Sequence, residues 1–124
     1  MFELDIHREF SAAHSLRGYN GDCSRLHGHN WTVQVFIRSE KLDEVGIAMD
    51  FKLLKKDLDA VLAELDHQNL NEHPYFKDRN ATSENLAVYI YNRLKPGISR
   101  PGLGLQLSKV RVCESASSGA SYFE

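Results

Sequence analysis

The sequence is poor in the features that mark several classes of protein. It contains two cysteines among 124 residues, which are too few for the disulfide framework of a small secreted domain. No apolar stretch approaches the roughly 18–20 residues that span a bilayer. The N-terminus begins at once with a strand-like alternation, which is not the pattern of a signal peptide. We therefore expect a cytoplasmic protein with no membrane partner.

Strong charge of either sign is also missing. The formal net charge is -2, and lysine and arginine form no long run, so binding to nucleic acid through neutralised phosphates is not expected. A hydrophobic content of 42% and a charged content of 26% are ordinary for a globular protein. The length predicts a single domain over residues 1–124.

Two segments near the N-terminus alternate between apolar and polar residues, as half-buried strands do. The first covers residues 2–14 and the second begins at His27, with a loop-like Gly18–Asp22 between them. Side chains two positions apart on a strand share a face, so His14, His27 and His29 fall on the face that carries most of the apolar residues. An antiparallel hairpin of these strands would bring the three imidazoles together.

Helical spacing follows the two strands. Asp50 is a plausible N-cap for a helix that runs to about Leu65. Thr82 can cap a second helix, which we expect to end at Pro96-Gly97.

The C-terminal part predicts two further strands. One runs from about Leu105 to Glu114, and a slip in its alternation between Leu107 and Val110 suggests a β-bulge. A turn at 117–119 precedes a last short strand at 120–124. The order ββααββ predicts an α+β fold, an antiparallel four-stranded sheet with both helices on one face. Its exposed strand edges make pairing between subunits a reasonable expectation.

The histidines favour a metal centre. Three imidazoles are a common way of holding catalytic zinc with its fourth position open, which makes His14, His27 and His29 candidate Zn²⁺ ligands. Cys23 allows two interpretations: a fourth ligand that closes a structural site, or a free thiol acting as a base or nucleophile beside the metal.

Three other residues lie where polar chemistry is possible. Asp66-His67 follows the first helix, and a direct contact between the two side chains requires the helix to end there; a merely polar helix end is the simpler interpretation. Glu114 shares the parity of apolar strand residues, and an acid on an apolar face needs a partner. Its carboxylate could accept the paired N–H donors of a purine-like or pterin-like ring. Cys113 is most simply a buried strand residue.

The sequence resembles the 6-pyruvoyltetrahydropterin synthase and 6-carboxytetrahydropterin synthase family. The resemblance covers nearly the whole chain and is carried by four ordered motifs: Cys23-x-x-x-His27-Gly28-His29-Asn30, Leu65-Asp66-His67-x-x-Leu70-Asn71, Thr82-Ser83-Glu84-Asn85-Leu86-Ala87 and Val112-Cys113-Glu114-Ser115. It implies the family's tunnelling fold, in which ββααββ subunits form a trimer around a twelve-stranded barrel and two trimers stack into a homohexamer. One departure is Ala81, where many members have proline.

The resemblance also implies roles for residues. It implies that His14, His27 and His29 ligate zinc, whereas Cys23 serves as the catalytic thiol. Asp66 and His67 would be its partners in a proton relay, contributed by a neighbouring subunit. The substrate-binding residues it implies are Glu114, as anchor of the pterin ring, with Thr82 and Ser83 in the same pocket.

The compact length favours the bacterial-type branch of this family. The implied activity is that of a zinc-dependent lyase, 6-carboxy-5,6,7,8-tetrahydropterin synthase, which converts 7,8-dihydroneopterin triphosphate to 6-carboxytetrahydropterin with release of acetaldehyde and triphosphate in queuosine and 7-deazapurine biosynthesis. One alternative is 6-pyruvoyltetrahydropterin synthase, which shares every motif. Another is a non-catalytic module that zinc stabilises. No Gly-rich cradle or basic cluster marks the triphosphate site.

Overall fold

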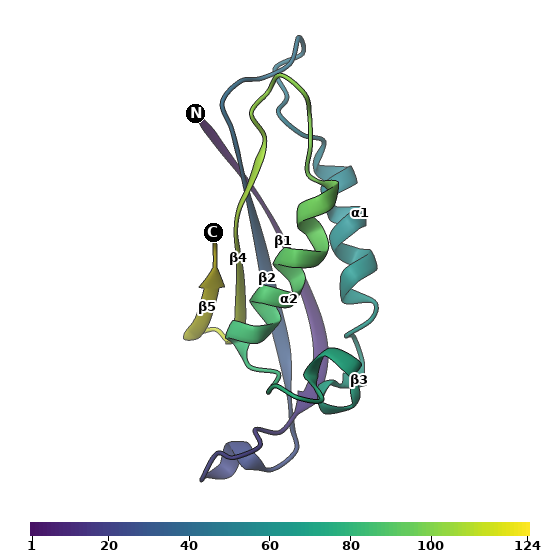
Figure 1. The fold of residues 1–124 in the computed structure, drawn as a ribbon, viewed down its shortest axis with the longest axis vertical. Helices are drawn as coiled ribbons and strands as arrows, with labels where there is room; N and C mark the ends of the chain where they lie inside the picture. Colours follow the sequence, from purple (N-terminus) through teal and green to yellow (C-terminus); the bar gives the residue numbers. More distant parts are fainter.

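The computed structural model describes residues 1–124 and has the α+β architecture that the sequence predicts (Figure 1). Helices α1 and α2 cover the same face of one sheet, whose strands lie in the order β3-β1-β2-β4-β5. The main elements, in chain order, are β1 (Phe2–His14), β2 (His27–Ser39), α1 (Phe51–Leu62), β3 (Gln68–Asn69), α2 (Ser83–Leu94), β4 (Gln106–Ser115) and β5 (Ser118–Tyr122).

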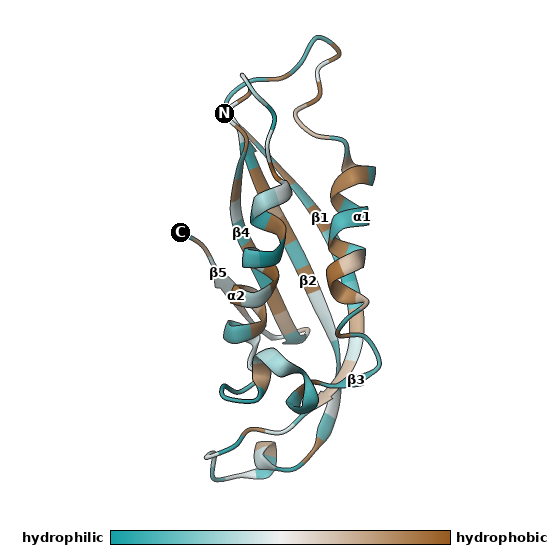
Figure 2. Ribbon diagram, turned by 45° about the vertical axis from the view of Figure 1, so that its right-hand side comes forward, coloured by the Kyte–Doolittle hydropathy of each residue, from teal (hydrophilic) through white to brown (hydrophobic).

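β1 and β2 form a long antiparallel hairpin, and the end that carries His14 and His27 is the lower end of the sheet in Figure 1. Their register pairs Phe2 with Ser39 at one end and His14 with His27 at the other. Along both strands buried residues alternate with exposed ones, and Figure 2 shows the matching alternation of hydrophobic and hydrophilic residues. The alternation predicted from the sequence is therefore confirmed. The connecting residues 15–26 project beyond this end of the sheet (Figure 1).

Both helices begin where the sequence predicts. The side chain of Asp50 accepts the backbone N–H of Lys52, and that of Thr82 accepts the backbone N–H of Asn85, so each satisfies a donor that the first turn leaves free. α1 ends at Leu62, short of the expected Leu65. The chain then turns toward the edge of β1, and this turn positions the residues that follow.

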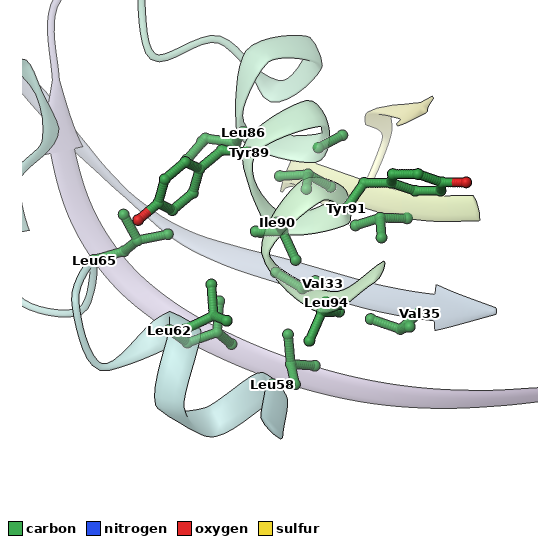
Figure 3. Packing of buried hydrophobic residues seen from close by; sticks show 14 of the residues in the cluster. Val33, Val35, Leu58, Leu62, Leu65, Leu86, Tyr89, Ile90, Tyr91 and Leu94 are labelled. Carbon is green, nitrogen blue, oxygen red and sulfur yellow. The ribbon is translucent and has the colours of Figure 1, made fainter. Parts of the chain in front are cut away.

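The core fills the space between the helices and the sheet. Figure 3 shows side chains of α1 and α2 pointing toward Val33 and Val35 of β2. Leu58, Ile90 and both valines have 0% of their surface exposed. Burial of this face holds the strands in register, because a slip by one residue would turn every apolar side chain of a strand to the opposite face.

The sheet differs from the predicted four strands in detail. β3 adds two residues that pair in parallel with Ala12 and Ala13 at the edge of β1, and so short a strand leaves no periodic pattern in the sequence. The predicted bulge is confirmed: Phe36 pairs with Lys109 and Ile37 with Leu107, so Ser108 is left without a partner on β2. β5 begins at Ser118, earlier than expected.

Neither helix combines the length and the apolar character needed to cross a membrane.

Replacing Leu58 with alanine should destabilise the fold strongly. Its side chain is 0% exposed, and truncating such a leucine costs about 2–5 kcal/mol. The matched control is Leu53→Ala on the same helix, where the side chain is 58% exposed. Denaturant unfolding measures both variants. Equal losses of stability would contradict the assignment of α1's buried face.

Candidate metal centre and catalytic site

Three imidazoles meet at the lower end of the hairpin. His14 lies directly across from His27, and Ala12 lies across from His29. The candidate ligand atoms of the three histidines all lie within 4.8 Å of one another. The hairpin register therefore brings His14, His27 and His29 together, as their parity in the sequence predicts.

Backbone carbonyls determine which ring nitrogen is free. His14 Nδ1 lies 2.7 Å from the carbonyl oxygen of Ala81, and His27 Nδ1 lies 2.6 Å from that of Arg25. A carbonyl oxygen can only accept a hydrogen bond, so each Nδ1 carries the proton and donates. The Nε2 atoms of both rings are then left with a free lone pair, as in many metal-ligating histidines.

Two ring nitrogens of the cluster are buried without a hydrogen-bond partner. Nε2 of His14 and Nε2 of His29 have no hydrogen bond, and a buried polar atom left unpaired is costly. A cation among the three rings would give both atoms a partner. Neutral imidazoles are ligands for zinc and other transition metals, and three of them leave a coordination position open. The donor set fits zinc.

Packing holds the rings in place. Trp31 is fully buried, and its indole N–H donates to the carbonyl oxygen of Ala12 at 3.2 Å. The rings of His14 and His29 contact Trp31 edge-on, at centroid distances of 4.9 Å and 5.1 Å. The ligand rings are therefore fixed by the core before any ion binds.

Burial also favours the neutral form of two of the imidazoles, His14 and His29. Desolvation is the main cause that lowers the pKa of His14 below the ordinary value of 6.5. Desolvation likewise lowers the pKa of His29, against the opposing effect of the Glu114 carboxylate. Both shifts favour the unprotonated ring, which is the form that binds a metal.

Glu114 lies beside this cluster in the same chain. It projects from β4 on the side of the buried Val112, and its Oε2 is 3.8 Å from His29 Nε2. Its side chain is 43% exposed, so the carboxylate borders both the histidines and the solvent. The sequence predicts that an acid on this face needs a partner, but within one chain the Glu114 carboxylate makes no hydrogen bond and its nearest titratable neighbour is His29.

Cys23 lies on a short 3-10 helix, Asp22–Ser24, in the loop between β1 and β2. It is exposed and free, and it is not part of the ligand group formed by the three histidines. This position is consistent with a thiol that acts near the metal without ligating it.

Asp66 and His67 form a pair at the edge of β1. Nδ1 of His67 lies 2.9 Å from Asp66 Oδ2, and Asp66 Oδ1 accepts the backbone N–H of Ser11 at 2.9 Å. The direct contact needs the helix to have ended, and His67 has a left-handed φ of 58°. The Ser11 N–H is the main cause that lowers the pKa of Asp66. The carboxylate therefore stays ionised and orients the imidazole.

The Asp66–His67 pair does not meet Cys23 within one chain. No hydrogen bond joins either side chain to the thiol, and the His67 side chain is 81% exposed. One chain thus gathers the histidines and Glu114 but leaves the thiol and the Asp–His pair as separate, solvent-facing groups.

Thr82 and Ser83 lie at the start of α2. Thr82 Oγ1 accepts the N–H of Asn85 at 3.1 Å, and Ser83 is buried. The carbonyl oxygen of the preceding residue, Ala81, accepts the hydrogen bond from His14 Nδ1. This contact could not be predicted from the sequence, because a backbone carbonyl is the same in every residue type.

A large surface hollow lies away from this site. It lies at the opposite end of the sheet, lined in part by Phe2, Ile47, Phe51 and Arg100, and none of the predicted site residues borders it. The chemistry of the side chains locates the site better than the size of the hollow. A shallower hollow does include His29 and His67.

Comparison with known proteins is consistent with this geometry. The sequence profile of the 6-pyruvoyl tetrahydropterin synthase family matches residues 3–124. A 6-carboxy-5,6,7,8-tetrahydropterin synthase of Synechocystis is 38% identical, over 95% of this chain and 92% of the relative. A putative enzyme of the same name from Archaeoglobus fulgidus is 39% identical, over 90% of this chain and 87% of the relative. The solved structure of Caenorhabditis elegans 6-pyruvoyl tetrahydropterin synthase superposes with a TM-score of 0.85 at 31% identity, over 99% of this chain and 95% of that one.

Substituting one histidine of the cluster should abolish metal binding. We expect the wild-type chain to retain about one zinc ion after dialysis, and His29→Asn to retain almost none, because two imidazoles hold zinc poorly. The control is His7→Asn, since His7 is exposed and lies outside the cluster. Elemental analysis measures the zinc. Undiminished zinc in His29→Asn would contradict the assigned ligands.

The metal-free protein should lose stability as the pH falls. The folded-state pKa values of His14 and His29 lie below 6.5, so near and below that pH the unfolded chain binds more protons, and stability rises with pH across this window. We expect Tm to fall between about pH 7 and about pH 5. Replacing both histidines with asparagine should flatten this dependence, and an unchanged slope would contradict the assignment.

Proposed function

The chain belongs to the 6-pyruvoyl tetrahydropterin synthase family, and from this premise we propose that it is a zinc-dependent 6-carboxy-5,6,7,8-tetrahydropterin synthase. The reaction would convert 7,8-dihydroneopterin triphosphate to 6-carboxytetrahydropterin, acetaldehyde and triphosphate. The proposed setting is the cytoplasmic synthesis of queuosine and related 7-deazapurines. The observation that carries the proposal is the trio of imidazoles, two with unpaired buried nitrogens, in a chain so similar to the Synechocystis enzyme.

The three histidines would hold the metal. Nε2 of His14 and of His27 is free because each Nδ1 donates to a carbonyl, and His29 would complete the set. Bound zinc supplies Lewis acidity, which stabilises negative charge on substrate oxygens. The packing of His14 and His29 against Trp31 would hold these two ligands in place before the ion binds.

Proton transfer would fall to the thiol and to the Asp–His pair. Cys23 is exposed and free, so its thiol would be available to exchange protons with the substrate. His67 donates from Nδ1 to the ionised Asp66, which leaves Nε2 free to take or return a proton. An oriented His–carboxylate pair of this kind is a common general acid–base unit.

Glu114 would bind the pterin ring. An ionised carboxylate has two oxygens that accept adjacent N–H groups of a planar ring, and its position near His29 would place that ring beside the metal. Thr82 would assist through its hydroxyl hydrogen, because its oxygen already accepts the Asn85 N–H. We assign Ser83 to the same pocket on the resemblance of its motif.

We propose that the full site forms between subunits. β5 is an edge strand, and β3 covers only Ala12 and Ala13 on the outer edge of β1. Such open edges favour pairing with another copy. Edge pairing into a trimer with a twelve-stranded barrel, and stacking of two trimers into a homohexamer, would bring the exposed His67 of one subunit to the Cys23 of another.

A second candidate is 6-pyruvoyltetrahydropterin synthase, which would eliminate triphosphate without releasing acetaldehyde. The superposition on the Caenorhabditis elegans enzyme supports it. The two activities differ in the fate of the substrate side chain, so product analysis separates them.

Turnover of the proposed substrate is the direct test. Purified zinc-loaded protein incubated with 7,8-dihydroneopterin triphosphate should release acetaldehyde and 6-carboxytetrahydropterin in equal amounts. Cys23→Ala should lower kcat by about 10²- to 10⁴-fold, because a general acid–base group is lost, while zinc is retained. The control is Cys113→Ser on β4. A pyruvoyl product without acetaldehyde would move the assignment to the second candidate, whereas loss of zinc in Cys23→Ala would favour a non-catalytic zinc module.

Mixed assemblies test whether neighbouring subunits share a site. Cys23→Ala and His67→Ala should each be nearly inactive alone. Hexamers assembled from an equal mixture should regain about one quarter of wild-type activity, because one site in four would draw an intact thiol and an intact imidazole from two different chains. Assemblies mixed after folding, without subunit exchange, serve as the control. Absence of recovery in verified mixed hexamers would contradict a shared site.

A further inference from the structure

Two asparagine side chains hold the chain where it leaves β1, at residues 15–17. Asn71 accepts the N–H of Ser15 through Oδ1 and donates to its carbonyl through Nδ2, both at 2.9 Å. Asn80 does the same with Arg17, at 3.0 Å and 2.9 Å. Each amide therefore pairs with both polar backbone groups of one residue, as a neighbouring antiparallel strand would.

The other edge of this segment is bonded to Cys23. The N–H of Leu16 donates to the carbonyl oxygen of Cys23 at 2.8 Å. Leu16, which lies between the two residues held by the asparagines, is therefore the residue that bonds to the thiol loop. The backbone of Cys23 is thus tied directly to the segment that Asn71 and Asn80 fix.

Hydrogen bonds, not buried side chains, order this loop. The Arg17 guanidinium also donates to the carbonyl oxygens of Phe76 and Arg79, and the carbonyl oxygen of Arg25 lies 2.6 Å from His27 Nδ1. Residues 17–26 are all exposed, and the 3-10 helix that carries Cys23 has no buried residue. A segment without buried apolar contacts depends on its hydrogen bonds for order. The loop's internal bonds, such as the N–H of Arg25 to the carbonyl of Asp22, shape its tip but do not attach it to the sheet.

The asparagines are themselves fixed by the segment that positions the metal ligands. Asn69 Oδ1 accepts the N–H of Asn71 at 3.1 Å, and Asn85 Nδ2 donates to the carbonyl of Asn80 at 2.8 Å. The next residue, Ala81, holds His14. One stretch of chain therefore sets the place of the thiol loop relative to the imidazoles.

We infer that Asn71 and Asn80 are positioning residues for the Cys23 thiol, acting through the backbone of residues 15–17. As far as it concerns turnover, this inference rests on the proposed function. A thiol that exchanges protons with a substrate beside the metal must stay at a constant distance from the histidines. A misplacement of about 1 Å can lower the rate about 10²-fold.

Asparagine-to-aspartate variants test the inference with little change in size. Aspartate keeps the oxygen that accepts the N–H, but it places a second acceptor against the backbone carbonyl of Ser15 or Arg17. The matched control is Asn92→Asp. Asn92 is an exposed residue of α2 and makes none of the hydrogen bonds to residues 15–17. For each variant, hydrogen exchange of peptides covering residues 15–24, zinc content, kcat and KM are measured on the assembled, zinc-loaded protein.

In Asn71→Asp and Asn80→Asp we expect exchange in residues 15–24 to become about tenfold faster or more. Zinc content should stay unchanged, and kcat should fall about tenfold or more with KM within about twofold. Asn92→Asp should match wild type in all four. Unchanged exchange would overturn the inference. So would faster exchange with an unchanged kcat, because the asparagines would then order the loop without positioning the thiol.

The two claims fail in different ways. If wild-type protein does not turn over the pterin triphosphate, the proposed function fails, and the exchange arm still decides whether the asparagines hold the Cys23 loop. If wild type is active and both variants are fully active, the inference fails and the proposed function stands.

Discussion

The antiparallel register of β1 and β2 is the constraint on which the rest of the site depends. It places His14 across from His27 and Ala12 across from His29, so that three imidazoles converge. Burial of Trp31, Val33 and Val35 on the same face fixes that register. A one-residue slip would expose these core residues and would also separate the three histidines. The histidine cluster that could hold a metal ion is therefore a continuation of the core at one end of the sheet.

The two halves of the site are held by different forces. The histidines and Glu114 rest on long strands, and carbonyl oxygens at Ala81 and Arg25 orient two of the rings. Cys23 lies on a loop of exposed residues that hydrogen bonds attach to the frame, and the Asp66–His67 pair faces solvent. In the proposed assembly, subunit contacts would bring the thiol and the Asp66–His67 pair together at the surface, while the histidines stay anchored on the strands of each chain.

Much of this arrangement could be predicted from the sequence, because it follows from strict periodicity. Alternation along residues 2–14 gave the strands and the histidine parity, and the caps at Asp50 and Thr82 gave the helix starts. β3 was missed because two residues carry no pattern. Two sets of hydrogen bonds were missed: the one to the Ala81 carbonyl oxygen, and those from Asn71 and Asn80 to the chain after β1. They join residues distant in the chain through backbone groups that every residue type shares. The pairing of Asp66 with His67 accompanies the end of α1 and a left-handed backbone at His67; histidine adopts that conformation more often than most residues, but still too rarely for the sequence to locate it.

X-ray absorption at the zinc edge tests the central claim most directly, because it reports the atoms bound to the metal. In the zinc-loaded protein we predict three imidazole nitrogens at about 2.0–2.1 Å and one oxygen ligand, with no sulfur at about 2.3 Å. The spectrum of Cys23→Ala should be the same. A sulfur ligand in the wild type that disappears in this variant would contradict the account, since Cys23 would then close a structural site instead of standing free beside an open one.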